Sequence, residues 1–418
     1  MFRHGTRRAG IIWRLIVMLT LAVTAADGQE RQYNIGPTVD VVSGSDSHPL
    51  NSLAGSTSAS TSPASFFRLY PAISVVTSGG QSTLKASYAL GLAGTRGDTD
   101  YNTLSHGATF AFSNPATSRW KLNLTESFLA SSDAASFNGL RGTSQPPDQF
   151  QFLFNPVALR VSTRTNTAGI VTEHALNPRA TLSLTGSHSL LNYGSGASQS
   201  ASLSDQQFVK GSINYTQKTS ARDALSVGYT AGYSSFQKFG NSTSHTVHAG
   251  YSVDITSDVR LALTVGTSRV GSLASVGSLT SLGTPESYVG YNASVSMSKT
   301  KLNDSFSVRY SQDTGQPTGL GSVSNTRLVG VSIGRRVGSI SLFVDASVYD
   351  AQGSLGNTFQ TRGASATASI GIPLTETLSI NGGAQYLRSA EAAPLGFTQQ
   401  RFFVTLRYDN PKLWTIFR

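Results

Sequence analysis

The sequence contains no cysteine, and only 13% of its 418 residues are charged. The absence of cysteine excludes a disulfide framework, a CxxC redox centre and any thiolate metal site. The shortage of charge is unusual for a soluble enzyme of this length. Glycine, by contrast, occurs 41 times, and with serine, threonine and asparagine it replaces much of the usual lysine and glutamate. Because these residues form helices poorly, we expect little helix.

The N-terminal apolar run is too short to cross a membrane. Residues 15–23 read LIVMLTLAV, whereas a spanning helix needs roughly 20 apolar residues. Arginines precede the run, and the small residues Ala25 and Ala26 follow it. This pattern predicts a secretory signal peptide at residues 1–26, and therefore an exported protein.

Clusters of basic residues are also lacking, although the formal net charge is +10. The lysines and arginines are scattered singly, whereas phosphate backbones are bound by a basic stripe or patch. We therefore expect no nucleic-acid partner.

Residues 27–64 are rich in Ser, Thr, Gly and Pro, and we predict a flexible segment. Within it, residues 33–42 (YNIGPTVDVV) are a candidate first strand. Pro37 restricts that strand to a seam or an end of a sheet, because proline donates no ladder hydrogen bond.

From Phe66 onward, apolar residues recur at every second position. Examples are residues 84–92 (LKASYALGL), 225–233 (LSVGYTAGY) and 340–348 (ISLFVDASV). A period of two is typical of a strand with one apolar and one polar face. About seventeen such segments follow one another between residues 65 and 409.

The links between these segments alternate between short and long. Residues 219–223 and 300–304 are tight polar links, whereas residues 132–148 and 270–285 are long and rich in Gly and Ser. Antiparallel strands can be joined in this way, whereas parallel strands need longer crossovers. The chain is therefore predicted to be one long antiparallel meander.

The polar face of the meander decides the class of fold. A β-sandwich would carry frequent Lys and Glu on its outward face, but here that face is mostly Ser, Thr, Gly and Asn. Such a face suits a water-filled interior, and the apolar face suits lipid. The segment lengths match the roughly 9 to 11 residues that a tilted strand needs to span a bilayer. We predict an all-β transmembrane up-and-down barrel of eighteen strands if residues 33–42 contribute one, with sixteen as the alternative.

The signal peptide, the hairpin rhythm and the aromatic residues near strand ends together carry a resemblance. Over residues 65–409 the chain resembles the porin-like β-barrels of the bacterial outer membrane. The resemblance implies an outer-membrane location, contact with outer-membrane lipid, and dependence on barrel-assembly machinery. The sequence departs from such barrels at its end, because Tyr408 is followed by the residues 409–418 (DNPKLWTIFR) rather than ending the chain. We treat residues 410–418 as a tail.

Alternate positions of the predicted strands give candidate lining residues for the lumen. These are Lys85, Lys121, Arg160, Arg164, Lys210, Asp254, Arg260, Arg309, Asp345, Arg401 and Arg407. The excess of cations predicts a preference for anions. The competing interpretation is that several of these residues lie near strand ends and contact lipid headgroups.

Catalysis finds little support in the sequence. His245 and His248 are three positions apart, so on a strand they face opposite sides and cannot share a metal. The sequence contains no HExxH, EF-hand or phosphate-loop spacing. We expect neither a cofactor nor enzymatic activity.

Three functions remain for such a barrel. The first is passive diffusion of small polar or anionic solutes, with the outer-membrane exit of an export system as a variant. The second is a structural or adhesive barrel with an occluded lumen. The third, a barrel enzyme, is the least supported. The sequence is compatible with both a single barrel and a homo-oligomer.

Overall fold

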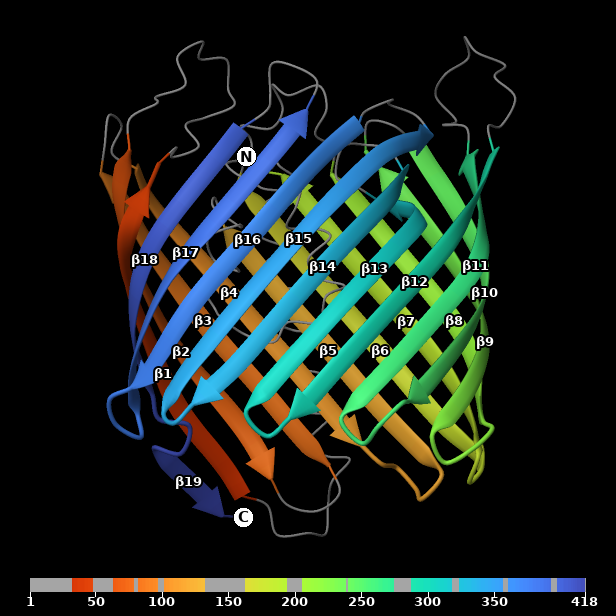
Figure 1. Ribbon diagram of the computed structural model, residues 1–418, viewed down its shortest axis with the longest axis horizontal. Helices are drawn as coiled ribbons and strands as arrows, with labels where there is room; N and C mark the ends of the chain where they lie inside the picture. Colours follow the sequence, from red (N-terminus) through yellow and green to blue (C-terminus); the bar gives the residue numbers. More distant parts are fainter. Residues whose placement is uncertain are drawn as a thin grey trace, which may run out of the picture.

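The computed structural model is a closed antiparallel β-barrel (Figure 1). The structure describes residues 32–47, 63–78, 82–96, 101–131, 162–193, 205–237, 240–273, 287–317, 323–355, 360–391 and 397–417. The predicted signal peptide, Arg160 and the whole of the 132–148 link lie outside these residues. Within them, no helix is long and apolar enough to cross a membrane.

In the described part of the chain, nineteen strands form a single sheet. They are β1 (Gln32–Asp46), β2 (Ala64–Ser78), β3 (Thr83–Arg96), β4 (Tyr101–Asn114), β5 (Trp120–Ser131), β6 (Thr163–Asn177), β7 (Ala180–Tyr193), β8 (Gln206–Lys218), β9 (Asp223–Phe236), β10 (Gly240–Asp254), β11 (Val259–Leu273), β12 (Ser287–Lys301), β13 (Asp304–Pro317), β14 (Val323–Val337), β15 (Ile340–Leu355), β16 (Gln360–Pro373), β17 (Leu378–Glu391), β18 (Phe397–Asp409) and β19 (Trp414–Phe417).

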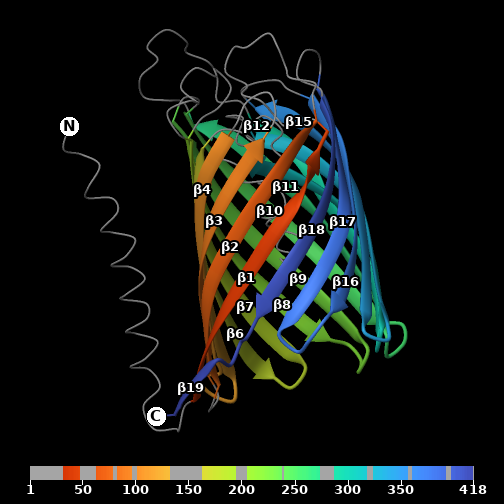
Figure 2. The same ribbon diagram turned by 90° about the vertical axis from the view of Figure 1, so that its left-hand side faces the viewer.

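The topology is up-and-down, and each strand pairs with its neighbours in the sequence. The first and last long strands close the barrel, because β1 pairs with β18 as well as with β2 (Figure 2). The prediction of an eighteen-strand barrel is therefore confirmed, and the sixteen-strand alternative is wrong. Closure pairs the backbone groups that an open sheet would leave at its two edges.

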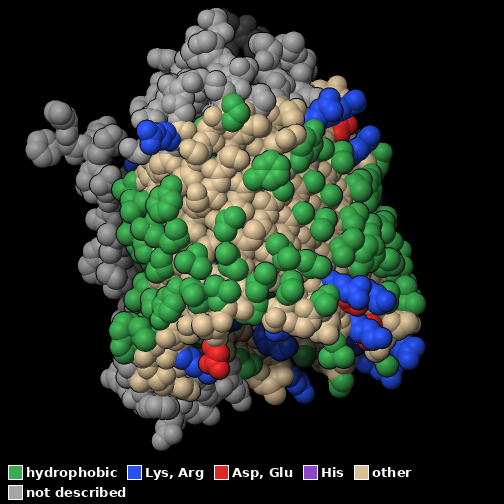
Figure 3. Space-filling view, turned by 60° about the vertical axis from the view of Figure 1, so that its left-hand side comes forward, with side chains coloured by type: hydrophobic (Ala, Val, Ile, Leu, Met, Phe, Trp, Pro, Cys, Tyr) green, Lys and Arg blue, Asp and Glu red, His purple; other side chains and the backbone are tan. Residues whose placement is uncertain are grey.

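The two faces of each strand meet different surroundings. On β10 and β11, Val247 and Val265 face outward and are 53% and 63% exposed, whereas Ser268 faces inward and is 0% exposed. On the face seen in Figure 3, hydrophobic side chains are spread over the outer wall between the ends, and Lys and Arg gather toward the ends. The exterior is therefore the face for hydrocarbon, and the interior carries the polar residues.

Four of the short turns share one capping device. The hydroxyl oxygens of Thr117, Ser220, Thr256 and Thr375 each accept a hydrogen bond from the backbone N–H three residues later, at 3.0 to 3.1 Å. Ser and Thr favour such turns because the side chain replaces a backbone acceptor. This hydrogen bond joins the first residue of each turn to the last, and so fixes the residue at which the next strand begins.

The seam between β1 and the end of the chain is irregular at Pro37. Pairing of β1 with β18 ends at Thr38 opposite Asp409, and pairing resumes between Ile35 and Trp414 of β19. The residues between, Asn410 to Leu413, form a bulge opposite Gly36 and Pro37. Proline has no N–H to donate, but its carbonyl accepts a hydrogen bond from the Asn410 N–H at 3.1 Å. The pairing of β1 with β18 and β19 is thus interrupted at Pro37, the residue of β1 that has no N–H to donate.

These strands modify the domain boundaries expected from the sequence. The candidate strand at residues 33–42 corresponds to β1, which extends from Gln32 to Asp46. The segment treated as a tail, residues 410–418, contains β19, which pairs with the first four residues of β1. The sequence did not indicate β19, because WTIF is too short to show a period.

Substitution of Gly36 should disrupt the seam. A Cβ atom at Gly36 would overlap the Asn410 carbonyl oxygen and the Pro411 backbone, and overpacking of this kind costs about 1–3 kcal/mol or more. We expect Gly36→Val to lower the fraction of barrel that migrates as the compact, heat-modifiable form on gels. Gly211→Ala is the control, because a Cβ at Gly211 meets no atom within 4 Å. Equal folded fractions for the two variants would contradict a close contact at the seam.

Candidate functional site

The inner wall of the barrel is lined by small hydroxyl residues paired across strands. Ser87 contacts Thr109 at 2.6 Å, Ser307 contacts Ser332 at 2.6 Å, and Ser347 lies 2.8 Å from Ser365. Each pair lies directly opposite in the strand register. Because these short side chains bond to one another across neighbouring strands, each pair gives the inner wall a polar patch that stays close to the backbone.

Aromatic residues on the inner wall lie flat over glycines. A Cβ at Gly91 would come within 2.8 Å of the Tyr70 ring, and a Cβ at Gly383 within 2.6 Å of the Phe403 ring. Tyr349 lies in the same way over Gly363. The missing side chain lets each ring pack against backbone, as in aromatic rescue of glycine. Large rings therefore cover the wall instead of projecting across the lumen.

A buried ion pair joins the first and last long strands at one end of the seam. Arg401 Nε of β18 lies 2.8 Å from Asp46 Oδ2 of β1, and the two side chains are only 8% and 6% exposed. The Gln399 amide donates to the same carboxylate oxygen at 2.7 Å. The charge-assisted bonds offset part of the cost of removing both charges from water.

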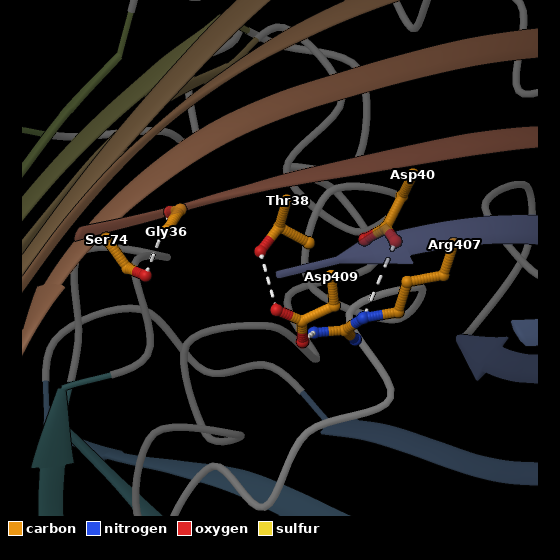
Figure 4. A network of polar contacts seen from close by, with 6 residues as sticks. All are labelled: Gly36, Thr38, Asp40, Ser74, Arg407 and Asp409. Atoms are coloured by element: carbon orange, nitrogen blue, oxygen red, sulfur yellow. Dashed lines mark hydrogen bonds and ion pairs between the residues drawn. The ribbon is translucent and has the colours of Figure 1, made fainter. Parts of the chain in front are cut away.

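A second polar network lies further along the same seam (Figure 4). Arg407 lies between two carboxylates, with its Nε 3.8 Å from Asp40 Oδ1 and its Nη2 3.2 Å from Asp409 Oδ2. Thr38 donates its hydroxyl to Asp409 Oδ1 at 3.3 Å. The side chains of β1 and β18 are thus linked across the line where the barrel closes.

The strand register places most of the predicted lining residues on the inner face. Those residues are Lys85, Lys121, Lys210, Asp254, Arg260, Arg309, Asp345, Arg401 and Arg407. They differ in whether a neighbouring carboxylate neutralises their charge. Arg401 and Arg407 bind acidic residues of the seam, and Arg260 lies 3.9 Å from Asp254. The Arg309 guanidinium lies over Gly330, where a Cβ would approach its Nε to 3.0 Å.

Arg164 differs from the prediction, because the register places it on the outer face. It occurs in β6 in phase with Ile170, which is 44% exposed on the exterior. Residues 163–169 (TRTNTAG), which precede Ile170, carry no large apolar side chain. The sequence therefore gave no indication of which residues in this half of the strand face outward. Arg164 is therefore not a lining residue, and Arg160 lies outside the described residues.

Sequence reasoning missed several inward charges. Asp40 lies on β1 between Val39 and Val41, Asp46 lies on β1 beyond the candidate strand, and Glu173 lies opposite Lys121. Arg68 was also missed; it is 3% exposed, with its guanidinium carbon 4.4 Å from the Phe66 ring centroid. The cationic excess of the inner wall is therefore smaller than the sequence indicated. Alternation in residues 66–70 (FFRLY) could have placed Arg68 inward.

The histidines of β10 face opposite sides of the wall. The outward His245 Nδ1 lies 2.6 Å from the Tyr229 hydroxyl, and the inward His248 lies against Gly228 beside Asn214. Among the residues that the structure covers, no group of three or more His, Cys, Asp or Glu side chains could hold a metal ion.

Glu126 points outward, as its phase indicated. Its Oε1 accepts a hydrogen bond from the Asn166 amide at 3.1 Å, and its side chain is 9% exposed. A carboxylate on this face is costly near the middle of a bilayer and cheaper near an interface. Glu126 lies near the middle of β5, so the hydrogen bond from Asn166 offsets part of the cost of placing its carboxylate there.

The closed barrel, its apolar outer wall and its polar inner wall decide the class of protein. Its architecture is that of a porin-like outer-membrane β-barrel. An even number of antiparallel strands with short turns at one end is the arrangement of such barrels, and a closed barrel leaves no unpaired backbone in lipid. The protein accordingly belongs in a bacterial outer membrane.

Comparison with known proteins gives a likeness of fold. No protein-family model and no curated protein matches the chain. Among solved structures, Pseudomonas aeruginosa OccK2 (OpdF) is 10% identical, with 91% of this chain and 98% of that chain covered and a TM-score of 0.46. OccK7 (OpdD) of the same organism is 11% identical, with 93% and 100% covered and a TM-score of 0.45. The ferric-catecholate import receptor Fiu of E. coli is 10% identical, with 90% and 81% covered and a TM-score of 0.44.

The buried seam pair should contribute far more to stability than an exposed pair. We expect Arg401→Met to lower the free energy of unfolding in lipid by about 3–5 kcal/mol, because it removes the Arg401 cation from the buried Asp46 carboxylate. The double variant Arg401→Met with Asp46→Leu should recover much of this loss. Denaturant unfolding in vesicles measures both effects.

The pair Arg260 and Asp254 is the matched control on the same inner wall. Its side chains are 64% and 50% exposed, so Arg260→Met should cost no more than about 1 kcal/mol. Similar losses for Arg401→Met and Arg260→Met would show that burial of the seam pair has no special effect.

Proposed function

We propose that the barrel is a passive outer-membrane pore for small polar solutes, with a weak preference for anions. The observation that carries this proposal is an eighteen-strand wall lined by small hydroxyl residues and glycine. Barrels of 16–18 strands leave an aqueous channel when their interior side chains do not fill it. Solutes would cross this lumen by diffusion, and its width and lining charges would select among them.

The preference for anions rests on inward cations that no acidic residue neutralises within the described part of the chain. Lys85 and Lys210 have no carboxylate within ion-pair distance there, unlike Arg401, Arg407 and Arg260. Cationic linings favour anions in pores. The acidic residues of the seam and Asp345 keep the preference weak. The excess of inward cations over acids is modest, so a broad range of polar solutes would pass.

Reversal of lining charge should change selectivity in a predictable direction. We expect Lys85→Glu and Lys210→Glu together to move the reversal potential, measured for single channels in a salt gradient, toward the cation side. The reason is that two inward positive charges become negative. Arg164→Glu is the control; it reverses one positive charge on the outer wall, as each of the two lumen substitutions does on the inner wall, and should leave the reversal potential unchanged.

Two results would contradict the proposal. An inserted barrel that passes no current and allows no solute-driven swelling of vesicles would indicate the occluded structural alternative. A wild-type pore that selects cations would refute the anion preference while leaving the pore itself in place.

A further inference from the structure

The outer wall carries a group of arginines that the lumen does not use. Arg327 of β14, Arg362 of β16 and Arg388 of β17 alternate in phase with outward apolar residues, and all three are exposed. Asp350 of β15 lies among them. We call these four residues the outer arginine cluster.

The strand register brings the cluster together. Asp350 lies directly opposite both Arg327 and Arg362, so these three form one row across β14, β15 and β16. Arg388 lies opposite Ala364, two positions along β16 from Arg362. With strands about 4.8 Å apart and about 3.3 Å per residue, the backbones of Arg327 and Arg362 lie about 5 Å from that of Asp350, and the backbone of Arg388 lies roughly 12 Å from it. Long guanidinium side chains can therefore converge on one anion.

One acidic residue does not neutralise three arginines. Arg362 Nε lies 3.4 Å from Asp350 Oδ1, with side chains 65% and 34% exposed. Neither Arg327 nor Arg388 forms an ion pair with any residue that the structure describes. The cluster thus keeps a net positive charge on an outer wall whose exposed side chains are mostly apolar.

The position of the cluster specifies the kind of anion. Two residues nearer the middle of the barrel, in the same phase, lie Val329 and Val348, which are 46% and 58% exposed. The arginines therefore mark the boundary between the apolar band and the end of the barrel at which the links between strands are long. In transmembrane barrels that end faces the outside. A charge held at this depth meets lipid headgroups of the outer leaflet.

We propose that the outer arginine cluster binds the phosphate of a membrane lipid headgroup, with the acyl chains of that lipid against Val329 and Val348. Arginine suits this task because its planar guanidinium binds phosphate through two parallel hydrogen bonds. Asp350 holds Arg362 in place but competes with the phosphate for it. The inference is independent of whether the lumen conducts.

The test compares lipid retention by the purified barrel after reconstitution in phosphatidylcholine vesicles that contain phosphatidic acid. Native mass spectrometry counts each lipid that stays bound. We expect the wild type to retain phosphatidic acid over phosphatidylcholine. The triple variant Arg327→Ala, Arg362→Ala, Arg388→Ala should lose about tenfold in retention, the equivalent of one strong charge-assisted contact.

A matched control exists on β14 itself. Arg335 faces outward like Arg327 but lies at the short-turn end, where its Nε is 3.6 Å from Asp304 Oδ1. Arg335→Ala should keep wild-type retention. Asp350→Asn tests the opposite direction and should increase retention, since it removes the competitor for Arg362. If the triple variant does not fold, Arg362→Lys replaces it, with a smaller loss because lysine cannot bind phosphate through two parallel bonds.

Three results would overturn the inference. The triple variant, or Arg362→Lys in its place, could retain as much phosphatidic acid as the wild type. Arg335→Ala could lose as much as the triple variant, which would indicate a general effect of charge. Inorganic phosphate could displace the lipid at equal phosphate concentration, which would indicate a site for the free anion instead of the lipid.

Discussion

The structure depends on one constraint: in hydrocarbon, every backbone N–H and C=O must find a partner within the protein. A sheet meets this requirement only when its first strand pairs with its last. Here β1 has to satisfy β2 on one side and two separate strands, β18 and β19, on the other. Pro37 makes the task harder, and the bulge at Asn410 to Leu413 accommodates it. The least regular part of the wall is thus the part that completes it.

The same constraint explains why the two faces of each strand carry different side chains. Once the backbone is paired throughout, alternate residues of a strand can face opposite sides, with Val and Leu toward lipid and Ser and Thr toward water. Glycine widens this choice on the inside, because rings such as Tyr70 and Phe403 can lie against bare backbone. The low charge and the high glycine content therefore both follow from a barrel with lipid outside and water inside. A soluble sheet has water on its outer face and would need charged residues there.

Much of the fold could be predicted from the sequence, because alternation repeated over many hairpins is a strong signal even when each segment is weak. The number of strands followed from the topology and from the apolar positions of residues 33–42. Arg164 could not be placed, since its stretch of β6 has no large apolar residue to set the phase. The role of Arg401 could not be predicted either. Its partner Asp46 is 355 positions away, and only the closed barrel brings the two together.

The charges of the seam bear on the lumen as well as on stability. A count of inward cations treats Arg401 and Arg407 as available to solutes, but both are held by carboxylates of β1 and β18. The local field near the seam is therefore closer to neutral than the composition indicates. Lysines on other parts of the wall, such as Lys85 and Lys210, are the cations on which the proposed anion preference rests.

The pairing of β19 with the start of β1 has a kinetic consequence. The hydroxyl of Thr415 bonds to the Asn34 side chain at 3.0 Å, across a separation of 381 positions. Contacts between distant parts of a chain form slowly, because the chain loses conformational entropy when its ends come together, before the contact contributes any stabilisation. Hairpins can form locally and early, whereas the perimeter is complete only when the two termini meet. The rate at which this barrel matures should therefore be limited by its ends and not by its hairpins.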